Sequence, residues 1–312
     1  MKMAFVFPGQ GSQSVGMGKG FHDSFESAKS LYDEANALLG YDLRKLSFEG
    51  PKEGLDRTEN TQPALLTASI AALTALNERI KIEPACLAGH SLGEYTALVA
   101  SGAIDFRDAV KLVHLRGLFM QESVPAGAGK MCAIIGLDLE NVTTICESAS
   151  MGAAQVVPAN INSPEQIVIS GDAAAVDIAA SYAKERGAKM VVPLQVSAPS
   201  HSPLMEKAAE KLDSELAHIA FRMPKVPVIT NVSAEPYKDA GEIRGLLKAQ
   251  LTSPVRWVDI IRRMKRDGID TIVEIGPGKV LAGLVKRIDK EIKTYNLSEA
   301  GDIDKLAFDM NR

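Results

Sequence analysis

Short apolar runs that resemble strands alternate with helix-length segments along most of the 312 residues. The strand-like runs of the outer parts of the chain cover residues 4–7, 85–88, 226–231 and 271–275. Strands separated by helices are typical of a mostly parallel sheet, because a parallel connection needs a crossover of a dozen or more residues. The alternation therefore predicts an α/β protein.

The helices between these strands follow from apolar spacing and from turn residues. Pro63 suits the first turn of a helix that begins at Ala64, and Asp105 suits the start of another. A Gly276–Gly278 turn is expected to open one last long helix. The other expected helices cover about 64–79, the stretch from the 89–93 turn to 100, 105–121, 203–220, 241–251 and 257–267.

The middle of the chain has a different pattern. After a stretch of small residues at 125–129, the order is strand, helix, strand, strand, helix, strand. That order is the ferredoxin-like unit. We therefore expect a small domain of residues 127–196, inserted into a large α/β domain of residues 1–126 and 197–312. The six elements are expected at 131–137, 139–150, 155–161, 166–170, 173–186 and 189–194.

Composition excludes several classes of function. With 35 Lys+Arg, 39 Asp+Glu and 5% aromatic residues, the composition gives no electrostatic reason to expect a nucleic-acid partner. The longest uncharged stretch, 60–77, contains Thr, Ser, Gln, Asn and Pro, so no membrane span is expected. The apolar run 3–7 ends at Pro8 and is too short for a secretory signal. We expect a cytoplasmic protein.

The three cysteines, Cys86, Cys132 and Cys146, have no paired short spacing. Neither a disulfide framework nor a zinc site is therefore expected, and the three thiols are predicted to be small core side chains. No ligand spacing typical of a metal, a nucleotide or another tightly bound cofactor is present, so none is expected.

The segment Gly89–Gly93 fits the pattern G-x-S-x-G between a predicted strand and a predicted helix. In such a turn the glycines relieve crowding, Ser91 is held at the apex, and the helix N-terminus lies where an oxyanion would form. The segment predicts a nucleophilic serine. The alternative is a glycine-rich turn whose serine only caps the helix.

A nucleophilic serine needs a base, and His201 is the best placed histidine. It lies in a loop that ends a strand and begins a helix, where the helix N-terminus disfavours the imidazolium. His90 adjoins Ser91 on a sharp turn, so these two side chains should diverge. The alternative for His201 is a hydrogen-bonded loop histidine. The remaining histidines lie in or beside helical segments: His22, His114 and His218.

Arg116 has apolar residues at all four helical neighbour positions, 112, 113, 119 and 120. A guanidinium on that face must find an anion or reach water, because a buried unpaired charge is costly. Arginine is also well shaped to hold a carboxylate through two parallel hydrogen bonds. Both a substrate carboxylate and an Asp or Glu of the chain itself remain possible partners.

The loop Gly9–Gln13 follows the first strand but lacks the lysine of a P-loop and the spacing of a dinucleotide fingerprint. A glycine-rich turn beside a nucleophile would instead allow a backbone N–H to approach the oxyanion.

Together these segments resemble the malonyl-CoA:acyl carrier protein transacylase family of fatty acid synthesis, in order and over essentially the whole chain. The resemblance implies a hydrolase-like large domain that carries a ferredoxin-like subdomain. The segments that carry it are Pro8–Gln13, Gly89–Glu94, Arg116, Asn162–Pro164, Ser200–His201 and Glu274–Gly278.

The resemblance implies that Ser91 takes the malonyl group from malonyl-CoA and passes it to the phosphopantetheine thiol of holo acyl carrier protein. His201 would be the general base and acid, and Arg116 would hold the free carboxylate of the malonyl group. Backbone N–H groups of Gln10 and Leu92 would form the oxyanion hole. We expect a monomer with no cofactor.

The resemblance also gives Gln250 a role, since its main-chain carbonyl matches the group that orients the catalytic histidine in this family. The third member of the triad then need not be a carboxylate. The basic segments 262–266 and 286–293 could receive an acidic carrier protein, although such runs are more often solvated helix faces.

Three alternatives remain open. A serine esterase or thioesterase would use Ser91 and His201 and let water finish the reaction. A catalytically silent docking module of a larger synthase would use neither. Ser200 also resembles the residue before the histidine in methylmalonyl-selective domains, whereas Ala198 and Pro199 favour malonyl.

Overall fold

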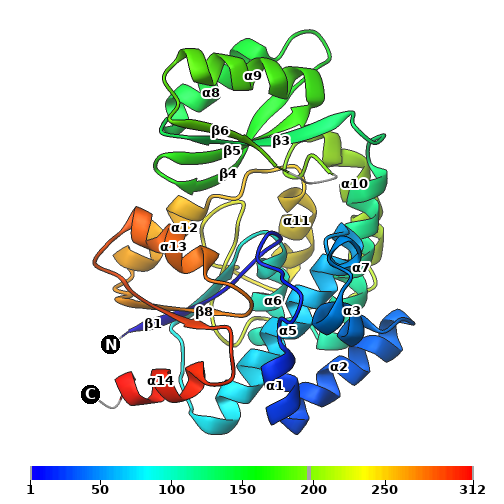
Figure 1. The fold of residues 1–312 in the computed structure, drawn as a ribbon, viewed down its shortest axis with the longest axis vertical. Coiled ribbons are helices and arrows are strands. Elements are labelled where there is room, and N and C mark those ends of the chain that lie inside the picture. Colours follow the sequence, from blue (N-terminus) through cyan, green and yellow to red (C-terminus); the bar gives the residue numbers. More distant parts are fainter. Residues whose placement is uncertain (1, 195–197, 311–312) are drawn as a thin grey trace.

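A five-stranded parallel sheet forms the centre of the larger part of the molecule (Figure 1). The computed structural model describes residues 2–194 and 198–310. The spatial order of the strands is β7-β2-β1-β8-β9, and each neighbouring pair is parallel, which confirms the predicted α/β class. The strands are β1 (Met3–Phe7), β2 (Cys86–Gly89), β7 (Val228–Ile229), β8 (Thr271–Ile275) and β9 (Lys293–Leu297).

Helices cover both faces of this sheet (Figure 1). They are α1 (Lys19–Ser24), α2 (Glu26–Leu39), α3 (Leu43–Glu49), α4 (Lys52–Leu55), α5 (Thr58–Arg79), α6 (Leu92–Ala100), α7 (Phe106–Glu122), α10 (Glu206–Leu216), α11 (Gly241–Gln250), α12 (Trp257–Arg266), α13 (Val280–Ile288) and α14 (Asp302–Met310). A 3₁₀ turn, η1 (Pro203–Met205), precedes α10.

All five residues of β1 are buried, because apolar side chains leave both faces of the strand. Phe5 and Phe7 join the core cluster formed with α5, α6 and α7, whereas Ala4 and Val6 join the cluster formed with α12 and α13. Both faces of the central strand are therefore buried. The loops that follow β1 and β2, which carry Gln10 and Ser91, extend from this well-packed sheet.

The smaller sheet is antiparallel, with the order β4-β5-β3-β6. Its helices α8 and α9 lie together on the face turned away from the larger part (Figure 1). The predicted strand and helix order is confirmed. The expected junction at 196/197 falls outside the described residues. The elements are β3 (Gly129–Ile135), α8 (Leu139–Ala149), β4 (Val156–Ser163), β5 (Gln166–Asp172), α9 (Ala173–Glu185) and β6 (Met190–Pro193).

Helix α5 corrects one prediction, because it begins at Thr58 rather than Ala64 and contains Pro63 as its sixth residue. Proline has no N–H and cannot donate to the carbonyl four residues earlier, that of Glu59. In the structure that carbonyl instead accepts a hydrogen bond from Nδ1 of His114 on α7, at 2.8 Å. A bond between helices replaces the missing bond within the helix, so the helix continues through the proline.

The end of the chain corrects a second prediction. The expected last long helix is wrong, since α13 ends at Ile288 and the chain continues into β9 and α14. The three charged residues 289–291 follow α13, and only Leu297 of β9 is fully buried. Strand β9 is defined by its parallel pairing with β8, a distant contact that leaves little local pattern. Two other predicted elements are shorter, with β7 at 228–229 and α10 ending at 216.

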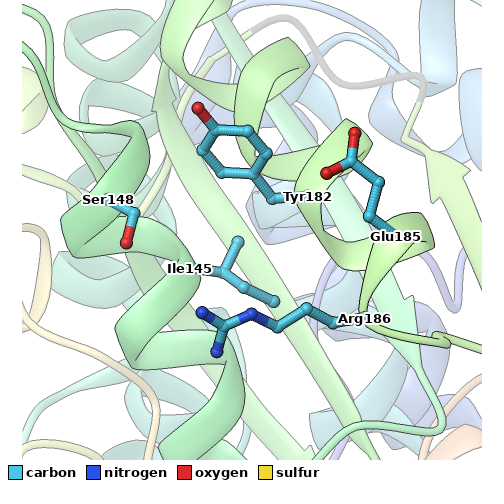
Figure 2. A pocket seen from close by; sticks show the side chains of 5 residues that line it. All are labelled: Ile145, Ser148, Tyr182, Glu185 and Arg186. Carbon is cyan, nitrogen blue, oxygen red and sulfur yellow. The ribbon is translucent and has the colours of Figure 1, made fainter.

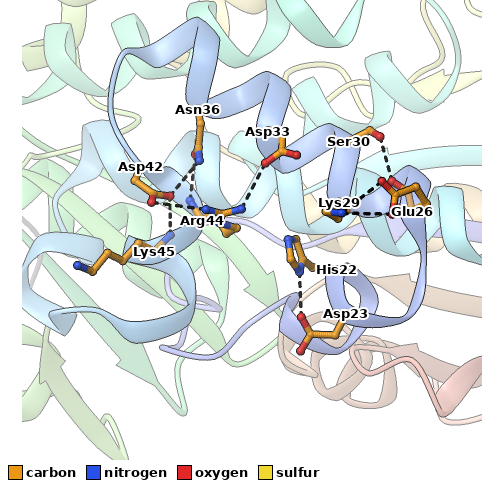
Figure 3. Close-up of polar contacts among 10 residues, drawn as sticks. All are labelled: His22, Asp23, Glu26, Lys29, Ser30, Asp33, Asn36, Asp42, Arg44 and Lys45. Carbon is orange, nitrogen blue, oxygen red and sulfur yellow. Dashed lines mark hydrogen bonds and ion pairs between the residues drawn. The ribbon is translucent and has the colours of Figure 1, made fainter.

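Helices α1 to α3 occupy a stretch for which the sequence pattern predicts no element. Figure 3 shows the polar contacts that order their surface. Asp42 caps α3 by accepting from the backbone N of Lys45 at 2.9 Å, and Nη1 of Arg44 lies 3.3 Å from Asp33 of α2. Below these contacts the rings of Tyr32 and Phe48 meet edge to face at 5.0 Å. Helices α1 and α3 are too short to show an apolar period, whereas α2 does have one, with Ala28, Tyr32 and Ala35 buried on one face, and the prediction missed it.

No helix in the described ranges is long and apolar enough to cross a membrane.

The small sheet and its helices carry a groove on their outer side. The groove, of about 290 Å³, lies between α8 and α9 and is lined by Ile145, Ser148, Tyr182, Glu185 and Arg186, whose side chains are drawn in Figure 2. None of the predicted site residues lies in it, and its rim is polar and charged. The groove is therefore separate from the site described below.

The close packing of α5 against α7 gives the first prediction. A Cβ added to Gly117 would lie 2.5 Å from Cα of Glu59, so Gly117→Ala should push the helices apart and cost about 1–3 kcal/mol in the free energy of unfolding. The matched control is Gly245→Ala on α11, where nothing lies within 4 Å and the change should stabilise by up to about 1 kcal/mol. Urea unfolding of both variants measures the difference. Equal effects would contradict the packing account.

Candidate active site

Ser91 lies at the turn between β2 and α6, with φ 51° and ψ −106°. A positive φ is uncommon for a residue other than glycine and marks strain that the surroundings must hold. The two glycines of the turn allow the close approach, since a Cβ on Gly89 would lie 1.8 Å from the carbonyl carbon of Gly93. A Cβ on Gly93 would lie 2.1 Å from the carbonyl oxygen of Phe7 in β1. The turn therefore has the sharp strand-to-helix form expected from the sequence.

Asn231, which follows β7, holds both sides of this turn. Its Oδ1 accepts from the backbone N of Ser91 at 2.7 Å, and its Nδ2 donates to the carbonyl of Gly89 at 2.7 Å. These bonds fix the strained peptide from a neighbouring strand. The sequence shows no signal for Asn231, because its contacts lie 140 residues away in the chain.

His201 meets Ser91 as predicted, with Nε2 2.8 Å from Ser91 Oγ. Its Nδ1 lies 2.8 Å from the carbonyl of Gln250 and 3.2 Å from that of Ser253. Carbonyl oxygens only accept, so Nδ1 carries the proton and Nε2 accepts the hydrogen bond from the Ser91 hydroxyl. The main-chain carbonyl of Gln250 thus orients the imidazole, and no carboxylate contacts His201 among the described residues.

The environment of His201 favours the neutral imidazole. The side chain is buried, and this burial together with the nearby Arg116 guanidinium lowers the pKa of His201 to about 3. At neutral pH the ring therefore has a free lone pair on Nε2 for the Ser91 proton.

The other histidines are engaged elsewhere or lie on the surface. The ring of His90 diverges from Ser91, as expected, and its Nε2 lies 2.8 Å from Oδ1 of Asn162 on β4. This contact ties the nucleophile turn to the small sheet. His22 pairs with Asp23, His114 bonds to α5, and His218 is exposed.

Arg116 is buried beside the nucleophile, with 1% of its surface exposed. Its Nη2 donates to Ser91 Oγ at 3.1 Å and to Oε1 of Gln250 at 3.0 Å, while Nη1 donates to Oε1 of Gln62 at 2.8 Å. The guanidinium also lies 5.3 Å from the centre of the Tyr95 ring. Within the described part of the chain no carboxylate forms a direct ion pair with Arg116; the carboxylate whose charge acts on it is that of Glu94, which is bonded to the same Gln250 amide.

Glu94 is a buried carboxylate that was not predicted as a site residue. It lies in the first turn of α6 and accepts from Tyr237 Oη at 2.5 Å, Gln250 Nε2 at 2.6 Å and the backbone N of Asn231 at 3.1 Å. Burial raises the pKa of Glu94 to about 7, although the three hydrogen bonds and Arg116 favour the ionised form. It is the only charged residue of α6, three residues after Ser91, and this is the signal that could have found it.

The residues predicted for an oxyanion hole lie on two neighbouring segments, the loop after β1 and the start of α6. Leu92 is the first residue of α6, so its backbone N–H has no partner within the helix. Gln10 follows β1 on the adjoining loop, and a Cβ on its neighbour Gly9 would lie 2.3 Å from the carbonyl oxygen of His90. The Gln10 side chain points to Thr58, with Nε2 at 3.4 Å from Oγ1.

Of the two basic segments predicted as a carrier surface, the first is partly paired within the chain. Arg263 contacts Glu235 and Asp267, and Lys265 contacts Asp289 and Glu291. These pairs favour the interpretation of this segment as a solvated helix face. Within residues 2–194 and 198–310, no group of three or more His, Cys, Asp or Glu side chains could hold a metal ion.

Comparison with known proteins places this geometry in context. Residues 4–303 match the acyl transferase domain family. The malonyl CoA-acyl carrier protein transacylase of Bacillus subtilis (strain 168) is 49% identical over 303 residues, 97% of this chain and 95% of the relative.

Solved structures agree with that relative. An acyl carrier protein S-malonyltransferase of Vibrio cholerae superimposes with a TM-score of 0.96 at 47% identity, covering 98% of this chain and 100% of the other. A malonyl-transacylase in complex with its type II PKS acyl-carrier protein gives a TM-score of 0.97 at 43% identity, covering 99% and 100%.

The low pKa of His201 gives the second prediction. An uncharged ester such as p-nitrophenyl acetate should acylate Ser91 at rates that differ by less than about threefold between pH 7.5 and 5.5, because His201 stays neutral throughout. Stopped-flow release of nitrophenol measures the rate, and His201→Ala should abolish the burst at each pH. A fall with a midpoint near the ordinary histidine value of about 6.5 would show that His201 is not desolvated as described.

Proposed function

Because this chain belongs to the malonyl-CoA:acyl carrier protein transacylase family, we propose that it transfers malonyl groups from malonyl-CoA to the phosphopantetheine thiol of holo acyl carrier protein. The transfer supplies extender units for fatty acid synthesis and passes through a malonyl-serine on Ser91. One observation carries the proposal. The guanidinium of Arg116, buried and without a carboxylate partner among residues 2–194 and 198–310, reaches to 3.1 Å from the Ser91 oxygen that would bear the acyl group.

The first half-reaction forms the malonyl-serine. Ser91 Oγ attacks the thioester carbonyl while its proton passes to Nε2 of His201, 2.8 Å away. When the tetrahedral intermediate collapses, the carbon–sulfur bond breaks and the proton moves from His201 to the departing CoA sulfur. The main-chain carbonyl of Gln250 holds the Nδ1 proton and stabilises the imidazolium that forms between these steps.

The second half-reaction repeats these steps with another thiol. The phosphopantetheine thiol gives its proton to Nε2 of His201, and its sulfur attacks the malonyl ester. The bond from the acyl carbon to Ser91 Oγ then breaks, and the proton returns from His201 to Ser91. The enzyme is regenerated with no net change of protons or electrons.

The oxyanion in both steps is bound by the backbone N–H groups of Gln10 and Leu92. Ser91 cannot contribute its own N–H, because that group is already bonded to Asn231. Leu92 adds the partial positive charge of the α6 N-terminus. Donors fixed in advance by a rigid turn stabilise the developing charge without reorganisation.

Arg116 selects the substrate by binding the free carboxylate of the malonyl group. A carboxylate next to Ser91 supplies the anion that this buried cation lacks. An acetyl group leaves Arg116 with neutral partners only, so it gains less from the site. The same ion pair positions the acyl ester for the carrier thiol.

The proposal extends to the form in which the protein works. Residues 127–196 act as a small domain inserted between 1–126 and 197–312. The enzyme is a monomer of the cytoplasm, needs no cofactor and acts on neither nucleic acid nor membranes. Three buried free cysteines support a reducing compartment. Light scattering at 33.4 kDa tests the monomer.

The experiment that tests the function is the intact mass of the protein after brief mixing with malonyl-CoA and again after addition of holo acyl carrier protein. A malonyl increment should appear on the enzyme and then move to the carrier, and Ser91→Ala should show neither. An increment lost to water equally fast with and without carrier would indicate a hydrolase. An increment with another acyl-CoA but not with malonyl-CoA would overturn the substrate.

The role of Arg116 gives a separate prediction. Arg116→Ala should lower kcat/KM for malonyl-CoA by roughly a hundredfold or more, since a buried charge pair contributes about 3 kcal/mol or more when one partner is removed. Acetyl transfer should persist. Arg107→Ala, on the exposed face of the same helix, is the matched control and should leave both substrates unchanged. An unaltered preference for malonyl over acetyl in Arg116→Ala would exclude the carboxylate role.

A further inference from the structure

Glu94 is a buried carboxylate that the mechanism above does not use. It lies one helical turn after Ser91. Among the described residues, its side chain forms no hydrogen bond with His201 or with Ser91. Its partners are all donors. Oε1 accepts from Tyr237, and Oε2 accepts from both Gln250 and the backbone N–H of Asn231. Burying a carboxylate costs free energy, which these three donors offset, so Glu94 holds each of the donor groups in a fixed orientation.

The side-chain amide of Gln250 connects Glu94 to the substrate-binding cation. Its Nε2 donates to Glu94 Oε2 at 2.6 Å and to the carbonyl of Ser91 at 3.1 Å. Its Oε1 accepts from Arg116 Nη2 at 3.0 Å. Each end of the amide therefore meets partners of the opposite kind.

The reverse orientation of this amide would break every one of these bonds. Its NH₂ would face the NH₂ of Arg116, donor against donor, and its oxygen would face Glu94 and the Ser91 carbonyl, acceptor against acceptor. Arg116 is held on one side by Gln62 and on the other by Gln250. A rotated Gln250 amide would therefore release the side of the guanidinium that reaches Ser91.

We propose that Glu94 is a positioning residue for substrate selection: its Oε2 locks the Gln250 amide with its oxygen toward Arg116, and thereby aims the guanidinium at the acyl group on Ser91. This role rests on the carboxylate-binding role of Arg116 proposed above. The orientation of the Gln250 amide depends on an acceptor within hydrogen-bond distance of its Nε2. It does not depend on the negative charge of Glu94, because Asn231 N–H would orient a neutral acceptor in the same place.

Two substitutions test the length and the charge of the Glu94 side chain separately. Glu94→Asp keeps the charge but shortens the side chain by one methylene, so the acceptor withdraws from Gln250. Glu94→Gln keeps the length, and its amide oxygen can accept from Asn231 and Gln250 while its NH₂ donates to the Tyr237 oxygen. The readout is the ratio of kcat/KM for malonyl-CoA to that for acetyl-CoA, with KM and kcat measured separately for each.

Glu94→Asp should lower this ratio by about tenfold or more, mainly through a higher KM for malonyl-CoA, because a buried donor of Gln250 loses its acceptor. Glu94→Gln should keep the ratio within about threefold of the unmodified enzyme. Tyr237→Phe is the matched control. It removes a hydrogen bond to the same carboxylate but on the oxygen that does not face Gln250, and should also preserve the ratio.

A double variant tests whether the effect passes through Gln250. Gln250→Ala removes the amide and keeps the main-chain carbonyl that holds His201. In that background Glu94→Asp should cause no further change in the ratio. Additive losses would show that Glu94 acts by another route and would overturn the proposal.

The remaining outcomes are also decisive. If Glu94→Asp lowers kcat/KM equally for malonyl-CoA and acetyl-CoA, Glu94 has a role in folding alone. If Glu94→Gln lowers the malonyl-to-acetyl ratio and Glu94→Asp does not, the charge of Glu94 and not its length is what matters. Either result overturns the proposed role of Glu94 in orienting the Gln250 amide. The Arg116→Ala variant separates this failure from that of the proposed function. If Arg116→Ala removes the malonyl preference and Glu94→Asp does not, only the role of Glu94 is wrong.

Discussion

The site depends on a buried arginine whose hydrogen-bond partners in the described structure are all neutral. Arg116 is 1% exposed and donates to two glutamine side chains and to the Ser91 hydroxyl. Amide oxygens and the Ser91 hydroxyl accept from its Nη1 and Nη2 groups without cancelling its charge, and its Nε has no hydrogen-bond partner among the described residues, so the site favours an anion. A carboxylate of the chain in that position would remove this preference. On the carboxylate-binding role proposed for Arg116, the selectivity of the enzyme would rest on a buried cation that no carboxylate of the described residues pairs with.

The same cation shapes the rest of the site. Its positive charge adds to burial in holding His201 neutral, which leaves Nε2 free to take the serine proton. An anionic third member beside His201 would oppose both effects by raising the pKa of the histidine. The structure instead orients His201 through the backbone carbonyls of Gln250 and Ser253, which bring no charge. Glu94, the buried carboxylate near Arg116, is one amide further away.

The sequence predicts those parts of the site that depend on local pattern. Gly89–Gly93 fixes a sharp turn, Arg116 stands among apolar neighbours on its helix, and His201 is the histidine outside a helical context that is free to turn toward Ser91. Asn231 and Gln62 are not predictable in this way, because their roles arise from contacts between strands and helices distant in the chain. The fold shows the same division. The small sheet follows local alternation, whereas β9 is defined by its pairing with β8 and the start of α5 by a bond from α7. Gln250 acts on His201 through its backbone, and only the family resemblance identified it.

The most direct test of this account is the thermal stability of the acyl-enzyme. Ser91 would be loaded with malonyl or with acetyl, and the melting temperature of each form compared with that of the free enzyme under the same conditions. If Arg116 lacks an anion in the free site, the malonyl ester should raise the melting temperature by at least about 2 °C more than the acetyl ester, since each kcal/mol corresponds to a few degrees in a protein of this size. Equal melting temperatures for the two acyl-enzymes would show that the malonyl carboxylate gains nothing from Arg116 and would contradict the account.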